Sequence, residues 1–296
     1  MVGDSIKAGI RQRAQANRLL SLELSVAAVD LLSPGFSRVV LEGPALDEYQ
    51  QPHPADAFKL MLPPEPGAPV DAPVRGASGI PEWSGENVQP ILRAFTVRRF
   101  DAAARQLTMD VARHEYGVGM RWLDAVRPGD EVSLSGMRPE WVVPKGVHDH
   151  VLLGDGAALP AIAGIIESLD PTDTVSAYVA LADPADVALV PDHPNLTLQR
   201  VDDLAEVVGR TPAAITAGRR TQAWIAAEAG TVRTLRAHAL EHWRIDRGDL
   251  LARAYWKQGS TSTDNDSAAI RKYQEAMAEG RDIQDPDLAE SIDLGM

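Results

Sequence analysis

The hydrophobic pattern of this chain changes its period near residue 147. Before that point apolar side chains alternate with polar ones, as at Leu107 and Met109, which is typical of half-buried antiparallel strands. After it, short apolar runs alternate with segments of helical period such as 159–169. Strands that alternate with helices indicate a parallel sheet. The sequence therefore predicts a β-barrel plus α/β architecture: an antiparallel barrel with one helical insertion, then a parallel-sheet domain, with a boundary near Lys145–Asp149.

Three further segments lie outside these two patterns. Residues 1–24 are predicted to form a polar N-terminal arm, and residues 63–90, rich in Pro, Gly, Ala and Ser, a long surface loop. Residues 260–296 form an acidic tail, which we expect to be mobile or to pack late on the surface, with a weak helix at 267–279. The barrel is thus assigned to residues 25–147 and the α/β domain to residues 148–259.

Composition excludes several classes of function. The 29 basic and 42 acidic residues among 296 give a net charge of -13, which argues against a nucleic-acid partner or an anionic membrane surface. The chain has no cysteine, so a redox centre must be an organic cofactor or a metal held by N and O ligands. It has no apolar run of transmembrane length and no secretory signal pattern near Met1, which predicts a cytoplasmic protein without membrane contact.

The first candidate site lies on a predicted strand at Arg93–Arg98. Strand alternation places Arg93 and Phe95 on one face, and Thr96 and Arg98 on the other. A planar, permanently charged guanidinium suits a phosphate, and a threonine hydroxyl can hydrogen-bond a ring nitrogen. The alternative is an exposed strand with ordinary surface arginines.

The second candidate begins at His114, where Gly117 and Gly119 open a short helix. Glycines at a helix start leave backbone N–H groups accessible, and such groups can cradle a pyrophosphate. The alternative is a tight turn before a helix that packs Trp122 inward. Both readings remain open from the sequence.

Two more candidates lie in the second half. Asp155, between two glycines, follows a strand and precedes a helix, at the strand end where ligands bind in open α/β sheets. The segment lacks the third glycine of a dinucleotide fingerprint, and a plain strand-to-helix turn is the alternative. Tyr255 and Trp256, placed beyond the last strand, can cover a flat ligand or pack on the barrel. The adjacent His148, Asp149 and His150 point in alternating directions, so no metal site is predicted.

Taken together and in this order, these elements resemble the siderophore-interacting proteins, which are ferredoxin-reductase-like flavoproteins. The similarity covers about residues 25–260. The resemblance implies an FAD-binding barrel, a nucleotide-binding-like α/β domain and reduction of a ferric siderophore to release Fe(II) for iron acquisition. The matching segments are Arg93–Arg98, His114–Trp122, Pro128-Gly129-Asp130, Gly154–Ala161, Trp224–Glu228 and Tyr255–Gly259.

The resemblance also implies roles for individual residues. One set would hold the flavin ring, ribityl chain and phosphate, and a second would surround the pyrophosphate and adenosine, while Asp155 would face the flavin from the second domain. Lys59 and Lys257 would attract an anionic ferric chelate, and no catalytic acid or base is implied. The first set is Arg93, Phe95, Thr96 and Arg98, and the second is His114, Gly117, Gly119 and Trp122.

The chain departs from the family pattern at several positions. Phe95 replaces a common tyrosine, Gly156 and Ala157 replace a Glu-Thr pair, and Ala227 replaces a glycine. The FAD site is therefore expected to be nearly intact, with NADH, NADPH or ferredoxin open as the electron donor. Two alternatives remain: a general NAD(P)H:flavin or quinone reductase, and a non-catalytic module that binds FAD or a siderophore.

Overall fold

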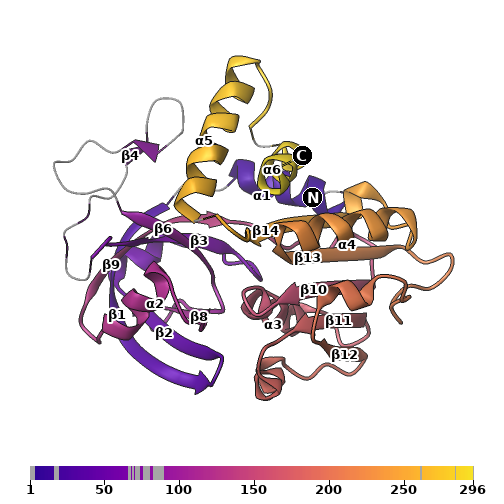
Figure 1. Cartoon of the computed structure of the whole chain (residues 1–296), viewed down its shortest axis with the longest axis horizontal. Coiled ribbons are helices and arrows are strands. Elements are labelled where there is room, and N and C mark those ends of the chain that lie inside the picture. Colours follow the sequence, from indigo (N-terminus) through magenta and orange to yellow (C-terminus); the bar gives the residue numbers. More distant parts are fainter. Residues whose placement is uncertain are drawn as a thin grey trace. The chain divides into compact units, whose positions relative to one another are not determined.

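The computed structural model of the chain describes residues 4–16, 20–65, 68, 70, 74, 75, 81, 82, 90–260, 262–283 and 285–295 (Figure 1). The chain forms two compact units. One comprises residues 18–138, and the other combines residues 1–17 with residues 139–296. The N-terminal segment therefore belongs to the same unit as the second half of the chain.

The first unit is built on a seven-stranded antiparallel sheet with the order β6–β3–β9–β1–β2–β8–β7 (Figure 1). The predicted antiparallel barrel is confirmed. The strands are β1 (Leu20–Ser33), β2 (Phe36–Glu42), β3 (Ala57–Leu62), β6 (Ile91–Thr96), β7 (Arg99–Asp101), β8 (Gln106–Ala112) and β9 (Glu131–Arg138).

Two residues join the two edges of this sheet. The edge strand β6 continues through Val97 and Arg98 into β7, which is the opposite edge. The Val97 N–H donates to the carbonyl of Asp56 beside β3 at 2.7 Å, and the Arg98 N–H donates to the carbonyl of Thr108 on β8 at 2.8 Å. The backbone thus bonds first to one side of the sheet and then to the other, which holds the sheet in its curled form.

The barrel core follows from the alternation of apolar residues along the strands. Every second side chain points inward, so the apolar positions of five strands meet in one cluster. Helix α2 (Val118–Ala125) adds Met120, Trp122 and Leu123 to this cluster. Its strand members include Leu22, Leu24, Val39, Leu41, Phe58, Leu60, Leu107, Met109 and Leu134.

The segment predicted as a long loop, residues 63–90, lies largely outside the described residues. Within it, β4 (Val74–Arg75) and β5 (Pro81–Glu82) pair antiparallel. A short 3-10 helix, η1 (Pro44–Glu48), follows β2 in the same unit.

The second unit contains a five-stranded parallel sheet with the order β12–β11–β10–β13–β14. Helix α4 (Ala229–Glu241) packs on one face, and α3 (Leu159–Ser168) covers the other, where Ile162 lies against Gly154 (Figure 1). The predicted parallel α/β architecture is confirmed. The strands are β10 (Asp149–Asp155), β11 (Thr174–Ala180), β12 (Leu196–Val201), β13 (Thr221–Glu228) and β14 (Leu250–Trp256); η2 (Pro184–Leu189), η3 (Leu204–Val207) and η4 (Arg247–Asp249) are 3-10 helices.

The placement of Tyr255 and Trp256 beyond the last strand was wrong. These residues end β14, a fifth parallel strand that pairs with β13. The strand was missed because its Leu, Ala and Arg residues favour a helix and it contains no β-branched residue. Burial in the sheet overrides this local preference.

Both termini contribute helices to the second unit. Helix α1 (Ile6–Ala16) contacts α6 (Pro286–Leu294), and α6 packs along the edge strand β14. Helix α5 (Ser262–Ala278) begins five residues before the predicted helix 267–279 and ends one residue before its end. The predicted arm and tail thus contain helices that pack within this unit. Among the described residues, no helix has the length and apolar character needed to span a membrane.

One buried carboxylate connects the two terminal helices with α4 and β14. Glu290 on α6 is 1% exposed and forms ion pairs with Lys7 of α1, at 3.1 Å, and with Arg236 of α4. It also accepts a hydrogen bond from the Ala252 N–H on the edge strand at 3.4 Å. The carboxylate therefore links three helices and one strand.

Candidate functional site

The strand β6 presents its predicted site residues on two faces. Phe95 is paired with Phe58 on β3 and packs against the barrel core, with the two ring centroids 6.3 Å apart. Arg93 lies on the same face, one step along the strand, and is half-buried. Thr96 is buried and faces the other way with Lys59. Contact of these side chains with a cofactor remains a prediction.

Arg98 belongs to a buried charge cluster that the sequence analysis did not identify. Its side chain is 7% exposed and lies 3.7 Å from the carboxylate of Asp110 on β8. The same carboxylate accepts two hydrogen bonds from Arg38 on β2, at 2.7 and 2.8 Å. Asp110 thus helps to hold Arg98 in place. The sequence carried no clear signal for this cluster, because Asp110 occupies a polar position of an alternating strand.

The start of α2 fits the phosphates of a nucleotide cofactor. Gly117 is the N-cap, with a φ of 125° that only glycine adopts readily, and the cap makes no side-chain hydrogen bond. The first turn contains no acidic residue. At Gly119, a β-carbon would meet no heavy atom within 4 Å. Backbone N–H groups at a helix start that lack a side-chain acceptor and have open space before them are suited to a pyrophosphate.

His114 and Trp122, the other predicted residues of this segment, have different environments. His114 is exposed, and its imidazole Cε1 lies 3.2 Å from where a β-carbon of Gly117 would be. Trp122 is 8% exposed and packs in the barrel core. The predicted inward packing of Trp122 is therefore observed, whereas binding of a pyrophosphate at Gly117 and Gly119 remains a prediction.

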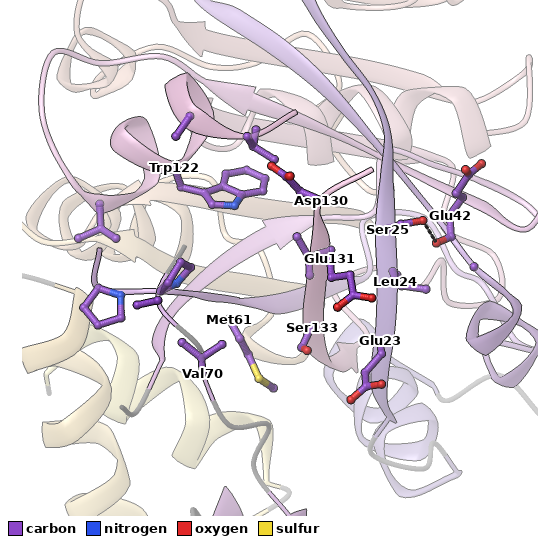
Figure 2. Close-up of a pocket in the computed structure, with 18 of the residues that line it drawn as sticks. Glu23, Leu24, Ser25, Glu42, Met61, Val70, Trp122, Asp130, Glu131 and Ser133 are labelled. Atoms are coloured by element: carbon purple, nitrogen blue, oxygen red, sulfur yellow. Dashed lines mark hydrogen bonds between the residues drawn. The ribbon is translucent and has the colours of Figure 1, made fainter. Parts of the chain in front are cut away.

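A hollow of about 830 Å³ opens between α2 and the outer faces of β1, β3 and β9 (Figure 2). The described residues that line it include the carboxylates of Glu23, Glu42, Asp130 and Glu131, together with Arg121. Trp122 is the only predicted site residue in its wall. Because the carboxylates repel phosphate, this acidic hollow does not fit the anionic part of FAD.

In the second unit, the carboxyl ends of the central strands carry two carboxylates. Asp155, at the end of β10, accepts hydrogen bonds from the Ala157 N–H at 3.0 Å and from the Trp256 indole at 2.7 Å. Glu228, at the end of β13, accepts from the N–H groups of Gly230, Thr231 and Gln258. The structure thus brings Asp155 and Trp256 together at the edge where open α/β sheets bind ligands.

Burial is the largest influence on the pKa of Asp155. It raises the pKa of this carboxyl group above its ordinary value, and the hydrogen bonds from Trp256 and the nearby amides act in the opposite direction. The indole of Trp256 is half-exposed and is held at this edge by its hydrogen bond. The arrangement can support a flat ring beside Trp256.

The remaining predicted residues are dispersed. Lys59 is half-buried on β3 in the first unit, whereas Lys257 is exposed directly after β14 in the second, so their joint pocket remains a prediction. His148 contacts Asp173 at 2.8 Å, and buried His150 lies 3.5 Å from the same carboxylate. Burial is the largest cause that lowers the pKa of His150 to about 4, so this histidine is neutral near pH 7.

Comparison with known families identifies the class of protein. Residues 25–141 match the siderophore-interacting FAD-binding domain, and residues 147–259 match the siderophore-interacting protein family. The two matches meet where the period of the sequence changes. The protein therefore is an FAD-binding oxidoreductase, and the chain belongs to the siderophore-interacting protein family.

Individual relatives agree with this assignment. An NADPH-dependent ferric-chelate reductase of Escherichia coli K12 is 33% identical over 172 residues, which cover 57% of this chain and 66% of that reductase. A siderophore utilization protein from T. fusca has a TM-score of 0.70 and 30% identity, covering 83% of this chain and 95% of the other. A siderophore-interacting protein from Acinetobacter baumannii, 20% identical, has the same fold, with a TM-score of 0.71 over 88% of this chain and all of the other.

Proposed function

We propose that this protein reduces ferric siderophores with FAD and thereby releases their iron as Fe(II). The observation that carries the proposal is the pair of matches to siderophore-interacting families, one for each unit. The relative named a ferric-chelate reductase supports the same substrate class. The open start of α2 supports a bound dinucleotide-type cofactor in the barrel unit.

The proposed chemistry requires positioning rather than acid–base catalysis. Bound FAD supplies the redox step, because it accepts two electrons and passes them on one at a time. Each electron converts one Fe(III) to Fe(II), which oxygen-donor chelators hold far less tightly. The protein's task is to hold the cofactor and bring the chelate near it.

The proposed roles of residues in the first unit follow from their positions on β6 and at the start of α2. Arg93, Thr96 and Arg98 are proposed to contact the flavin side of the cofactor, since they lie on or beside the edge strand β6. Gly117 and Gly119 are proposed to admit the pyrophosphate to the N–H groups of α2. Phe95, His114 and Trp122 complete the proposed cofactor set.

The second unit is proposed to complete the site. Asp155 and Trp256 are proposed to supply its ligand-binding edge, and Lys257 with Lys59 is proposed to attract the negatively charged chelate. The electron donor is proposed to be NAD(P)H or a reduced ferredoxin. A ferredoxin is favoured as the donor, because Gly156 and Ala157 place no hydroxyl group at the end of β10 that could contact a nicotinamide.

An anaerobic absorption experiment tests the proposal. The purified protein, incubated with FAD if needed, is treated with NADPH or NADH and then with a ferric siderophore. We expect a flavin spectrum that bleaches with the donor and returns when the chelate is added. Bleaching only with reduced ferredoxin would assign the donor to that class.

Other results would favour the alternatives. Electron transfer to free flavin or quinone without preference for ferric chelates would favour a general reductase on this fold. A flavin that is never reoxidised by a chelate would favour a binding module. A protein that takes up no FAD would refute the proposal.

A further inference from the structure

Tyr116 is an unusually accessible aromatic residue. It is 79% exposed, more than any other large apolar side chain in the described part of the chain, with Leu31 next at 70%. It makes no hydrogen bond and no ring contact with the described residues. A single exposed apolar side chain is common on protein surfaces, so its meaning depends on its neighbours.

Its neighbours are the phosphate-binding elements of the proposed cofactor site. Tyr116 directly precedes Gly117, the N-cap of α2, and lies two residues after His114. The first turn of α2 has no side-chain cap, and the space at Gly119 is open. An exposed ring beside an open group of backbone N–H donors combines the two features that bind an adenine nucleotide: a stacking surface and an anion site.

We propose that Tyr116 stacks on the adenine ring of FAD and makes this site select FAD over FMN. The inference rests on the proposed position of the FAD pyrophosphate at α2. With the flavin at β6 and the pyrophosphate at α2, the adenine is the part of FAD that still needs a contact surface. Tyr116 provides it without any rearrangement of the barrel core.

Trp122 and the acidic hollow are less suited to this role. The indole of Trp122 is 8% exposed and packs among the core residues, so it offers no free ring face of the kind that Tyr116 offers. The hollow beside it is lined by Glu23, Glu42 and Glu131, which disfavour the phosphates that must accompany the adenine (Figure 2). The family resemblance implied that Trp122, with three neighbouring residues, surrounds the pyrophosphate and adenosine, and it implied no role for Tyr116.

Removal of one base–aromatic stack weakens binding by about tenfold or more. This effect acts only on ligands that contain the stacked base. FAD and ADP both contain adenine, whereas FMN has the flavin ring and one phosphate but no adenine. The three ligands therefore separate adenine stacking from flavin stacking and from a general loss of the site.

In the test, the flavin-free protein is titrated separately with FAD, FMN and ADP, and a dissociation constant is measured for each ligand. For Tyr116→Ala we expect FAD and ADP binding to weaken by about tenfold or more, with FMN binding unchanged. Tyr116→Phe should retain wild-type affinity, because the ring suffices for stacking. Leu31→Ala, which removes another exposed apolar side chain, serves as the matched control and should change none of the constants.

Three outcomes would overturn the inference. Unchanged FAD and ADP affinity in Tyr116→Ala would show that the ring does not contact the adenine. Weaker FMN binding with unchanged ADP binding would place Tyr116 on the flavin ring. An equal loss for all three ligands would assign Tyr116 a role in shaping the loop. If the wild-type protein bound none of them, the proposed function would fail before this inference was reached.

Discussion

Helix α2 of the barrel unit and helix α4 of the α/β unit begin in opposite ways. α2 starts at Gly117 without a side-chain cap and without an acidic residue in its first turn. α4 starts at Glu228, whose carboxylate accepts from the N–H groups of Gly230 and Thr231. The amides that a helix start leaves unpaired are thus open to a ligand in the first case and satisfied by the chain itself in the second.

The two units also differ in the surroundings of their buried ion pairs. In the barrel unit, Asp110 is shared by Arg38 and Arg98, and Arg98 is also a proposed cofactor residue. In the α/β unit, Glu290 is enclosed by Lys7 and Arg236, and none of these three residues is a proposed cofactor contact. The difference indicates that binding of FAD should stabilise the barrel cluster, whereas the Glu290 cluster should depend on packing alone.

The largest expected effect comes from the Glu290 cluster. Glu290→Ala leaves the mostly buried Arg236 without this carboxylate, although Lys7 keeps its ion pair with Asp287. The substitution should reduce the free energy of unfolding by about 3–5 kcal/mol. Urea unfolding followed by tryptophan fluorescence measures the loss. Saturating FAD should leave the difference from wild type unchanged.

The matched control for this variant is Asp282→Ala. Asp282 pairs with Arg11, also between α1 and the C-terminal segment, but both side chains are largely exposed. Its loss should cost less than about 1 kcal/mol. Equal effects of the two variants would contradict a special role for the buried carboxylate.

A smaller effect is expected in the barrel. Asp110→Asn removes the charge that Arg38 and Arg98 share, which should cost about 2 kcal/mol, because Arg38 can recover part of its hydration. If Arg98 contacts the FAD phosphate, saturating FAD should offset part of this loss by binding the folded state. Thermal unfolding with and without FAD tests this.

The control here is Asp47→Asn, which removes an exposed pair with Arg105 in the same unit. It should change neither the midpoint nor its response to FAD. A loss in Asp110→Asn that FAD does not reduce would mean that the arginine cluster closes the barrel without binding the cofactor. The contrast between ligand-dependent and packing-dependent charge clusters would then disappear.

Local periodicity explains which parts of the fold were predictable. The strands β2, β3 and β8 and the helix α3 follow directly from alternation or from a 3.6-residue repeat, and all four occur where the sequence indicated them. β14 has the composition of a helix, so its strand structure depends on contacts with distant parts of the chain. Helix α6 does carry local signals, Asp285 and Pro286 at its start and Gly295 at its end, which the sequence-based prediction did not use.

Contacts between distant residues also limited the prediction of the candidate site. The motifs at Gly117 and Asp155 carry local glycine signals, and the structure places both at helix or strand ends. The pairing of Arg38 with Asp110 spans 72 residues, and that of Lys7 with Asp287 spans 280. No spacing rule relates residues so far apart. The exposure of Tyr116 likewise depends on how the chain folds around it and not on its sequence neighbours.

The smallest expected effect tests the opening contrast directly, at the start of α4. Burial acts to raise the pKa of Glu228, but the hydrogen bonds from the N–H groups of Gln258, Thr231 and Gly230 outweigh it and lower the pKa below the ordinary 4.5. The ionised carboxylate therefore stabilises the folded state above the unfolded pKa, and this contribution is lost as the pH falls through the lower folded pKa.

Glu228→Gln should accordingly cost about 1 kcal/mol at pH 7, and urea unfolding should show the difference from wild type shrinking below about pH 4.5. Glu241→Gln, at the exposed C-terminal end of α4, is the control with the opposite sign, because a carboxylate there opposes the helix dipole. If Glu228→Gln lost nothing at pH 7, the amides of α4 would be satisfied without this carboxylate. The absence of a cap on α2 would then no longer distinguish it as the helix start that is open to an anion.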